Sequence, residues 1–133
     1  MPVGSRDFRY AIELAESGTL STEDGTTLAP AAAWSPEHLL LAALVRCSLD
    51  SLRFHARRAE VELTAASGSA GALVTRRASD GRYAVVEAEL ELDVRLEPLP
   101  AGERLAELLA KAERDCFVGA SLAAKPRYTW NVA

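Results

Sequence analysis

The chain has 133 residues, a length that suits one domain with a sizeable hydrophobic core but not two. Apolar residues make up 49% of the sequence and charged residues 26%, which is ordinary for a globular protein. The net charge is −4 at pH 7, and no run of lysine or arginine offers the basic stripe that binds phosphates. We therefore expect one domain over residues 1–133 that does not bind nucleic acid.

No membrane anchor, targeting segment or cofactor is expected. No basic-then-apolar leader opens the chain, and the apolar run over 39–45 is far shorter than the ~20 residues that span a bilayer. We therefore expect a cytoplasmic protein. Its two cysteines, Cys47 and Cys116, are too few for the disulfide framework of a small secreted domain. No CxxC motif or histidine-rich spacing indicates a zinc site.

The N-terminal part of the chain predicts three short strands. Residues 8–14 alternate apolar and polar side chains, the pattern of a half-buried strand. Turn signals at 17–18 and 23–25 then separate short strands over 19–22 and 26–29.

A long helix follows and forms the centre of the predicted fold. Ser35 can cap free backbone N–H groups, and Pro36 suits the first helical position, so we expect a helix over 36–58. Its first half, over 39–45, is apolar on every side, which predicts a helix that is buried all round. Cys47 lies near its middle.

The rest of the chain predicts three strands, a helix and a terminal strand, over 61–65, 73–75, 83–96, 101–115 and 127–132. The glycine-rich segment over 67–71 is interpreted as a loop or an irregular strand bulge, and 118–122 as a short turn of helix. The order βββ-α-βββ-α-β predicts the α+β class, in which strands and helices are segregated.

The neighbours of Cys47 on its own helix do not activate a thiol. At helical spacing they are Leu40, Ala43, Leu44, Asp50 and Ser51. An apolar surface with one acidic group raises the pKa of a thiol and keeps it inert, so any activation must come from outside this face. No Ser-His-Asp pattern recruits Ser48 or Ser51, which we expect to be helix-surface or packing hydroxyls.

Three segments of the chain together resemble a known family. The first reads Ser-Pro-Glu-His-Leu-Leu over 35–40 and reaches Cys47 ten residues after its glutamate. The second reads Gly-Thr-Leu-Ser-Thr-Glu-Asp-Gly over 18–25, and the third is the Cys116 segment over 111–122. They resemble the cysteine helix, the N-terminal hairpin and the second cysteine segment of the OsmC/Ohr proteins (osmotically induced protein C and organic hydroperoxide resistance). With matching element order, the resemblance covers nearly the whole chain.

The resemblance implies an OsmC-like fold in which two chains form an intertwined homodimer, with the long helices in its core. Many members are thiol peroxidases that reduce organic hydroperoxides. Cys47 would attack the peroxide and become a sulfenic acid, and Cys116 would convert it to a Cys47–Cys116 disulfide. An external dithiol would then reduce the disulfide. Glu37 would belong to the polar network of this site.

The chain departs from the family pattern at two places. The activating arginine of the family lies just before the Gly-Thr segment, where this chain has Ala15 or Glu16. Neither side chain can stabilise a thiolate. Phe117 and Gly119 replace the proline and serine that usually follow the second cysteine.

Helix geometry also separates two of the candidate residues. Ten residues at 1.5 Å per residue place Glu37 and Cys47 about 15 Å apart along a straight helix, so a bend or a partner chain must bring them together if they cooperate. Two further functions stay open beside the peroxidase. One is a non-enzymatic dimer that binds a small apolar molecule in the interface cleft, and the other is a redox sensor whose disulfide forms without efficient turnover.

Overall fold

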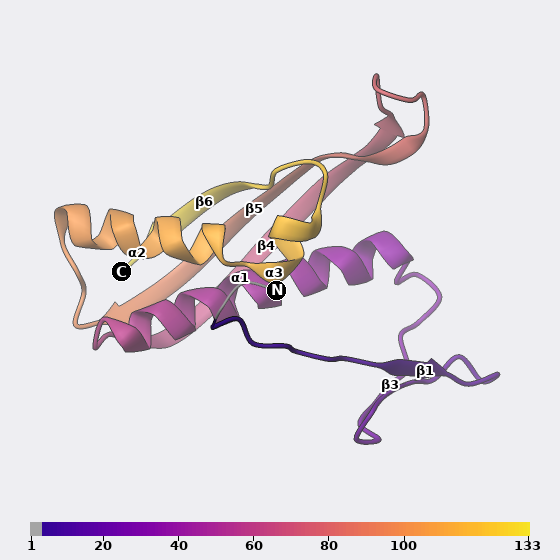
Figure 1. Ribbon diagram of the computed structural model, residues 1–133, viewed down its shortest axis with the longest axis horizontal. Coiled ribbons are helices and arrows are strands. Elements are labelled where there is room, and N and C mark those ends of the chain that lie inside the picture. Colours follow the sequence, from indigo (N-terminus) through magenta and orange to yellow (C-terminus); the bar gives the residue numbers. More distant parts are fainter. Residues whose placement is uncertain (1–3) are drawn as a thin grey trace. The chain divides into compact units, whose positions relative to one another are not determined.

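Strands and helices are segregated along the chain in the computed structural model, which describes residues 4–133 (Figure 1). This arrangement confirms the predicted α+β class. The chain divides into two compact units, Met1–Ser35 and Pro36–Ala133. One OsmC-like domain over residues 1–133 stays a prediction.

The first unit carries a small antiparallel sheet with the strand order β1-β2-β3. Its strands are β1 (Ile12–Leu14), β2 (Leu20–Thr22) and β3 (Thr27–Leu28). β1 is shorter than the strand predicted over 8–14. Thr22 pairs with Ile12 and is the last residue of β2, so the pairing of the two strands ends at Ile12.

The second unit packs helices against a three-stranded sheet with the order β4-β5-β6. In chain order its elements are α1 (Pro36–Arg58), β4 (Glu62–Arg76), β5 (Tyr83–Glu97), α2 (Gly102–Arg114), α3 (Phe117–Ser121) and β6 (Arg127–Val132). β4 and β5 form a long antiparallel hairpin, and β6 pairs with β5 in parallel. The predicted helix over 36–58 and terminal strand over 127–132 are both confirmed.

The glycine-rich segment after α1 does not interrupt the sheet. β4 is one strand of 15 residues, so the order along the chain is βββ-α-ββ-α-α-β rather than βββ-α-βββ-α-β. Gly68 pairs with Leu92 in the middle of the hairpin, and a Cβ at this position would lie 2.6 Å from the carbonyl oxygen of Glu91. Gly68 therefore allows a close approach of two strands, where the sequence pattern predicts a loop or an irregular strand bulge.

The core lies between α1, α2 and one face of β5. Alternate residues of β5 are buried: Ala88, Leu90, Leu92, Val94 and Leu96. From α1, the residues at four-residue spacing are buried: Leu44, Ser48, Leu52 and Ala56. Two apolar clusters result, one around Leu52 and Leu108 and one around Leu44, Leu92 and Cys116.

The prediction that α1 is buried all round is wrong for the single chain. Its buried residues form one stripe, and within the apolar run over 39–45 only Leu44 is fully buried. The other six residues of this run are half-buried or exposed. No helix within residues 4–133 is long and apolar enough to cross a membrane.

Candidate functional site

The two cysteines lie in the same apolar cluster of the second unit, on different elements. Cys47 lies in the middle of α1 and is half-buried. Cys116 is the residue directly before α3 and is fully buried. Both are free thiols. The packing of α3 against α1 brings the two cysteines, 69 positions apart in the sequence, into one site.

The first turn of α3 supplies a backbone N–H group to each sulfur. The N–H of Val118 donates to Cys47 Sγ at 3.5 Å, and the N–H of Gly119 donates to Cys116 Sγ at 3.4 Å. Cys116 thereby caps α3 as a serine or asparagine often does, because the first N–H groups of a helix have no partner within it. The sequence predicted a turn of helix here but not its contact with Cys47.

Within the single chain, the environment of Cys47 keeps its thiol neutral. Burial raises the pKa of Cys47, and the neighbouring Cys116 thiol raises it further. The N–H groups of Val118 and Phe117 act in the opposite direction. The net direction is upward, as the apolar helix face predicts.

Two hydroxyl groups complete the surroundings of Cys116. Ser48 Oγ lies 3.5 Å from Cys116 Sγ and 2.8 Å from the hydroxyl of Tyr128, a half-buried residue on β6. Ser48 also donates to the carbonyl of Leu44 at 2.8 Å. The prediction of Ser48 as a packing or surface hydroxyl did not include this contact. The sequence does contain a signal for it, because Ser48 lies four residues from both Leu44 and Leu52 and so falls on the buried stripe of α1.

Glu37 is not brought to the cysteines within one chain. It is exposed in the first turn of α1, which is one continuous helix from Pro36 to Arg58, so ten residues at 1.5 Å per residue place it about 15 Å from Cys47 along the axis. Ala15 and Glu16 lie between β1 and β2, where the N–H of Ala15 donates to Thr19 at 3.0 Å.

Polar contacts outside the thiol pair anchor the Cys116 segment to α1. His55 Nε2 lies 2.8 Å from Asp115 Oδ2, and the hydroxyl of Ser51 donates to the carbonyl of Ala112 at 2.8 Å. The Arg114 guanidinium, together with His55, lowers the pKa of Asp115 to about 2. These bonds fix the end of α2, and with it the position of Cys116.

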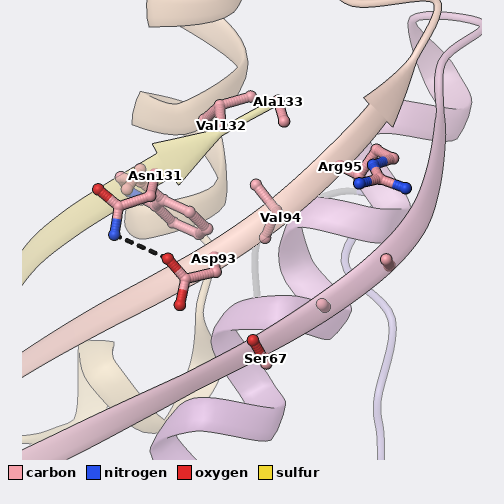
Figure 2. Close-up of a pocket in the computed structure, with 10 residues that line it drawn as sticks. Ser67, Asp93, Val94, Arg95, Asn131, Val132 and Ala133 are labelled. Carbon is pink, nitrogen blue, oxygen red and sulfur yellow. Dashed lines mark hydrogen bonds between the residues drawn. The ribbon is translucent and has the colours of Figure 1, made fainter.

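A separate groove of about 790 Å³ lies on the sheet (Figure 2). It is lined by residues of β4, β5 and the C-terminal end of the chain, and neither cysteine is among them. The amide of Asn131 donates to Asp93 at 2.8 Å across its floor, so these two polar side chains are paired with each other. The groove therefore does not belong to the thiol site.

The comparisons with known proteins agree with this fold. The sequence matches the family described as OsmC-like protein over residues 29–131. No curated protein matches the chain. The structure is similar to an OsmC-like protein of unknown function from Vibrio cholerae O1 biovar eltor str. N16961, at 14% identity and a TM-score of 0.74. That likeness covers 93% of this chain and 99% of the other.

Several similar structures carry a functional name, among them the following two. One is an organic hydroperoxide resistance protein OsmC from Legionella pneumophila, at 17% identity and a TM-score of 0.61, covering 97% and 99% of the two chains. The other is the organic hydroperoxide resistance protein OhrB of Bacillus subtilis, at 18% identity and a TM-score of 0.55, covering 94% and 96%. At these identities the likeness shows the fold alone. Because the family match spans most of the sequence, the chain belongs to the OsmC-like protein family.

Proposed function

We propose that this protein is a thiol-dependent peroxidase that reduces organic hydroperoxides with Cys47 and Cys116. The observation that carries the proposal is the pairing of a half-buried thiol with a fully buried one, each bonded to an N–H group of α3. Cys47 is the more accessible thiol, which suits it to attack a substrate. Cys116 is buried, which suits it to form a disulfide with Cys47 afterwards. The names of the relatives from Legionella pneumophila and Bacillus subtilis support the substrate class.

The proposed cycle has three steps. The Cys47 thiolate attacks the terminal oxygen of the hydroperoxide, the O–O bond breaks, and a sulfenic acid forms while the departing alkoxide takes a proton from solvent and leaves as the alcohol. The Cys116 sulfur then attacks the Cys47 sulfur, the S–O bond breaks, and water leaves as the disulfide forms. An external dithiol reduces this disulfide by exchange and becomes oxidised in turn. We place the cycle in the cytoplasm, a reducing compartment that keeps such dithiols available.

We further propose that the working form is a homodimer. In the single chain, six of the seven residues of the apolar run over 39–45 are half-buried or exposed, and a second copy of the chain would cover them. A partner chain is also the remaining way to bring Glu37 near Cys47, because α1 is a continuous helix between them. Glu37 is acidic and would not itself stabilise the Cys47 thiolate, so a positive charge in place of the family's arginine would have to come from another residue.

A specific observation favours a second candidate. Burial raises the pKa of Cys47 in the single chain, and a thiol that stays neutral reacts slowly with peroxides. If the dimer does not reverse this shift, the protein is a redox sensor with slow oxidation or a non-enzymatic module that binds a small apolar molecule.

Turnover with a dithiol tests the peroxidase directly. The reduced protein is mixed with cumene hydroperoxide and dithiothreitol, and peroxide consumption is followed together with the intact mass of the protein. We expect catalytic consumption and, without dithiothreitol, a disulfide that peptide mapping assigns to Cys47 and Cys116. Because the chain has only two cysteines, Cys47→Ser and Cys116→Ser each leave a single thiol and serve as matched controls. Stoichiometric oxidation without turnover would support the sensor, and no thiol loss would support the binding module.

A further inference from the structure

The buried end of the thiol site holds a hydroxyl pair that the proposed cycle does not use. Ser48 is fully buried on α1, and Tyr128 approaches it from β6 with an oxygen–oxygen distance of 2.8 Å. The ring of Tyr128 stacks on Trp130 at 5.6 Å, and Trp130 Nε1 donates to Glu113 at 2.9 Å. The phenol is therefore held in place by the ring stack and by Ser48, and its hydroxyl also lies beside Cys116.

The hydrogen atoms available at Ser48 determine what it can do for Cys116. A serine hydroxyl has one hydrogen to donate and two lone pairs that accept. Its hydrogen is directed to the carbonyl of Leu44 at 2.8 Å. Both lone pairs are then free to accept, one from the O–H of Tyr128 and one from the S–H of Cys116 at 3.5 Å.

This arrangement gives the Cys116 thiol one preferred orientation. Its sulfur accepts the N–H of Gly119 at 3.4 Å, and its hydrogen points to Ser48. Gly119 leaves room for this, because a Cβ there would meet Cys116 Sγ at 3.4 Å and the Tyr128 hydroxyl at 3.5 Å. With its hydrogen turned to Ser48, the sulfur can present a lone pair to Cys47.

We propose that Ser48 and Tyr128 are positioning residues that orient the Cys116 thiol for disulfide formation. The inference deepens the proposed peroxidase and rests on it for its place in the cycle. Ser48 accepts the S–H hydrogen of Cys116 through one of its lone pairs. The O–H of Tyr128 occupies the other lone pair, which keeps the accepting one directed at Cys116. A sulfur lone pair of Cys116 forms the S–S bond as the S–O bond of the Cys47 sulfenic acid breaks. The Cys116 S–H bond breaks in the same step, and its proton combines with the departing hydroxide to give one water.

The test separates the two chemical steps by rapid mixing with cumene hydroperoxide. In Ser48→Ala we expect formation of the sulfenic acid at the rate of the unchanged protein, and disulfide formation slowed about tenfold, the worth of one hydrogen bond. Tyr128→Phe removes only the phenol oxygen and slows the disulfide step about threefold. Both variants therefore accumulate sulfenic acid, which dimedone traps for mass analysis.

Thr64→Val is the control, since it removes an exposed hydroxyl of β4 that donates to the carbonyl of Arg95 at 3.4 Å and takes no part in the thiol site. We expect it to form the disulfide at the unchanged rate. Equal disulfide rates in Ser48→Ala and Thr64→Val would overturn the proposal. If cumene hydroperoxide does not oxidise Cys47 in the unchanged protein, the peroxidase fails by itself. The same comparison with diamide as oxidant then decides the role of the hydroxyl pair.

A spectroscopic measurement tests the bond without any oxidant. In Cys47→Ser, Cys116 is the remaining thiol, and we expect its Raman S–H stretching band at the lowered frequency of a hydrogen-bond donor. Adding Ser48→Ala moves this band to higher frequency, and adding Thr64→Val does not. An S–H band that stays in place in the Ser48 variant would contradict the proposed orientation.

Discussion

At the scale of single residues, the site contains opposing influences on one thiol. The N–H of Val118 favours the thiolate of Cys47, while burial and the Cys116 thiol favour its neutral form. Within one chain the second set dominates, so the pKa of Cys47 is raised. A substitution at Cys116 removes its contribution to the pKa of Cys47 without changing any residue of α1.

Cys116→Ser should therefore lower the pKa of Cys47 relative to the unchanged protein. The pKa is measured from the pH dependence of alkylation by iodoacetamide, with the modified peptide identified by mass. Burial persists in the variant, so we expect the pKa to fall only by the share that Cys116 contributes. Thr64→Val, which removes an exposed hydroxyl of β4, serves as the control and should leave the value unchanged. A pKa of Cys47 that stays the same or rises in Cys116→Ser would contradict this account of its environment.

Part of this site could be predicted from the sequence. The rest could not, because it depends on contacts between residues far apart in the chain. The neutral thiol of Cys47 followed from its helical neighbours, and the roles of Cys47 and Cys116 came from a resemblance. The contact between Ser48 and Tyr128 joins residues 80 positions apart, on α1 and β6, and no local pattern contains it. The role of Glu37 is still a prediction, because its expected partner lies outside the single chain.

At the scale of secondary structure, local patterns predicted α1, β5 and α2 closely. The apolar periodicity of β5 and α2 matches the faces that pack together, and the start signal at Ser35 and Pro36 places the start of α1. The exception is β4, whose small residues gave no periodic signal over 67–71. There the deciding factor is the close approach of β5, which a local pattern does not contain.

Gly68→Ala should destabilise the β4–β5 hairpin. Its Cβ would lie 2.6 Å from the Glu91 carbonyl oxygen and from Leu92 Cδ2, and overpacking of this kind costs about 1–3 kcal/mol of the free energy of unfolding. Gly71→Ala is the matched control on the same strand, because its nearest atom is the end of the Glu89 side chain at 3.4 Å. Urea unfolding measures both variants. Equal stability of the two would show that the strands separate easily at Gly68.

Asp115→Asn should remove a pH-dependent stabilisation at the end of α2. The pKa of Asp115 is about 2 in the folded chain against 3.8 ordinarily, so its stabilisation is present above pH 3.8 and is lost as the pH falls through 2. The Asp115 side chain is 39% exposed, which limits the effect to below about 1 kcal/mol. Urea unfolding at several pH values should show a difference between the variant and the unchanged protein that disappears in acid. A difference that is constant with pH would contradict this assignment, and Asp50→Asn provides an exposed control.

At the scale of the whole molecule, the apolar run of α1 is the feature that one chain leaves unexplained. A helix that is apolar on every side is normally buried on every side, and this one is buried along a single stripe. In the proposed dimer a second chain would cover the remaining surface of this run, so that the sequence pattern would describe the assembly rather than the single chain.

Ala43→Arg should break the proposed dimer while leaving the core of each chain intact. Ala43 is exposed in the single chain, so the added charge meets no buried side chain unless a second copy covers it. Sedimentation should give about twice the chain mass of 14.3 kDa for the unchanged protein and the single mass for the variant. Ala106→Arg places the same charge on an exposed position of α2 and should remain dimeric. A monomeric unchanged protein would refute the dimer, and a dimeric Ala43→Arg would place its interface elsewhere.

The most direct test of the peroxidase is the rate at which cumene hydroperoxide oxidises Cys47 in Cys116→Ser, where the reaction stops at the sulfenic acid. Trapping with dimedone gives the rate and assigns the oxidised residue by mass. We predict that one equivalent of sulfenic acid forms on Cys47, many times faster than on free cysteine, and that the remaining thiol of Cys47→Ser reacts slowly. Oxidation of Cys47 at the rate of free cysteine, or slower, would contradict a peroxidase built on this thiol.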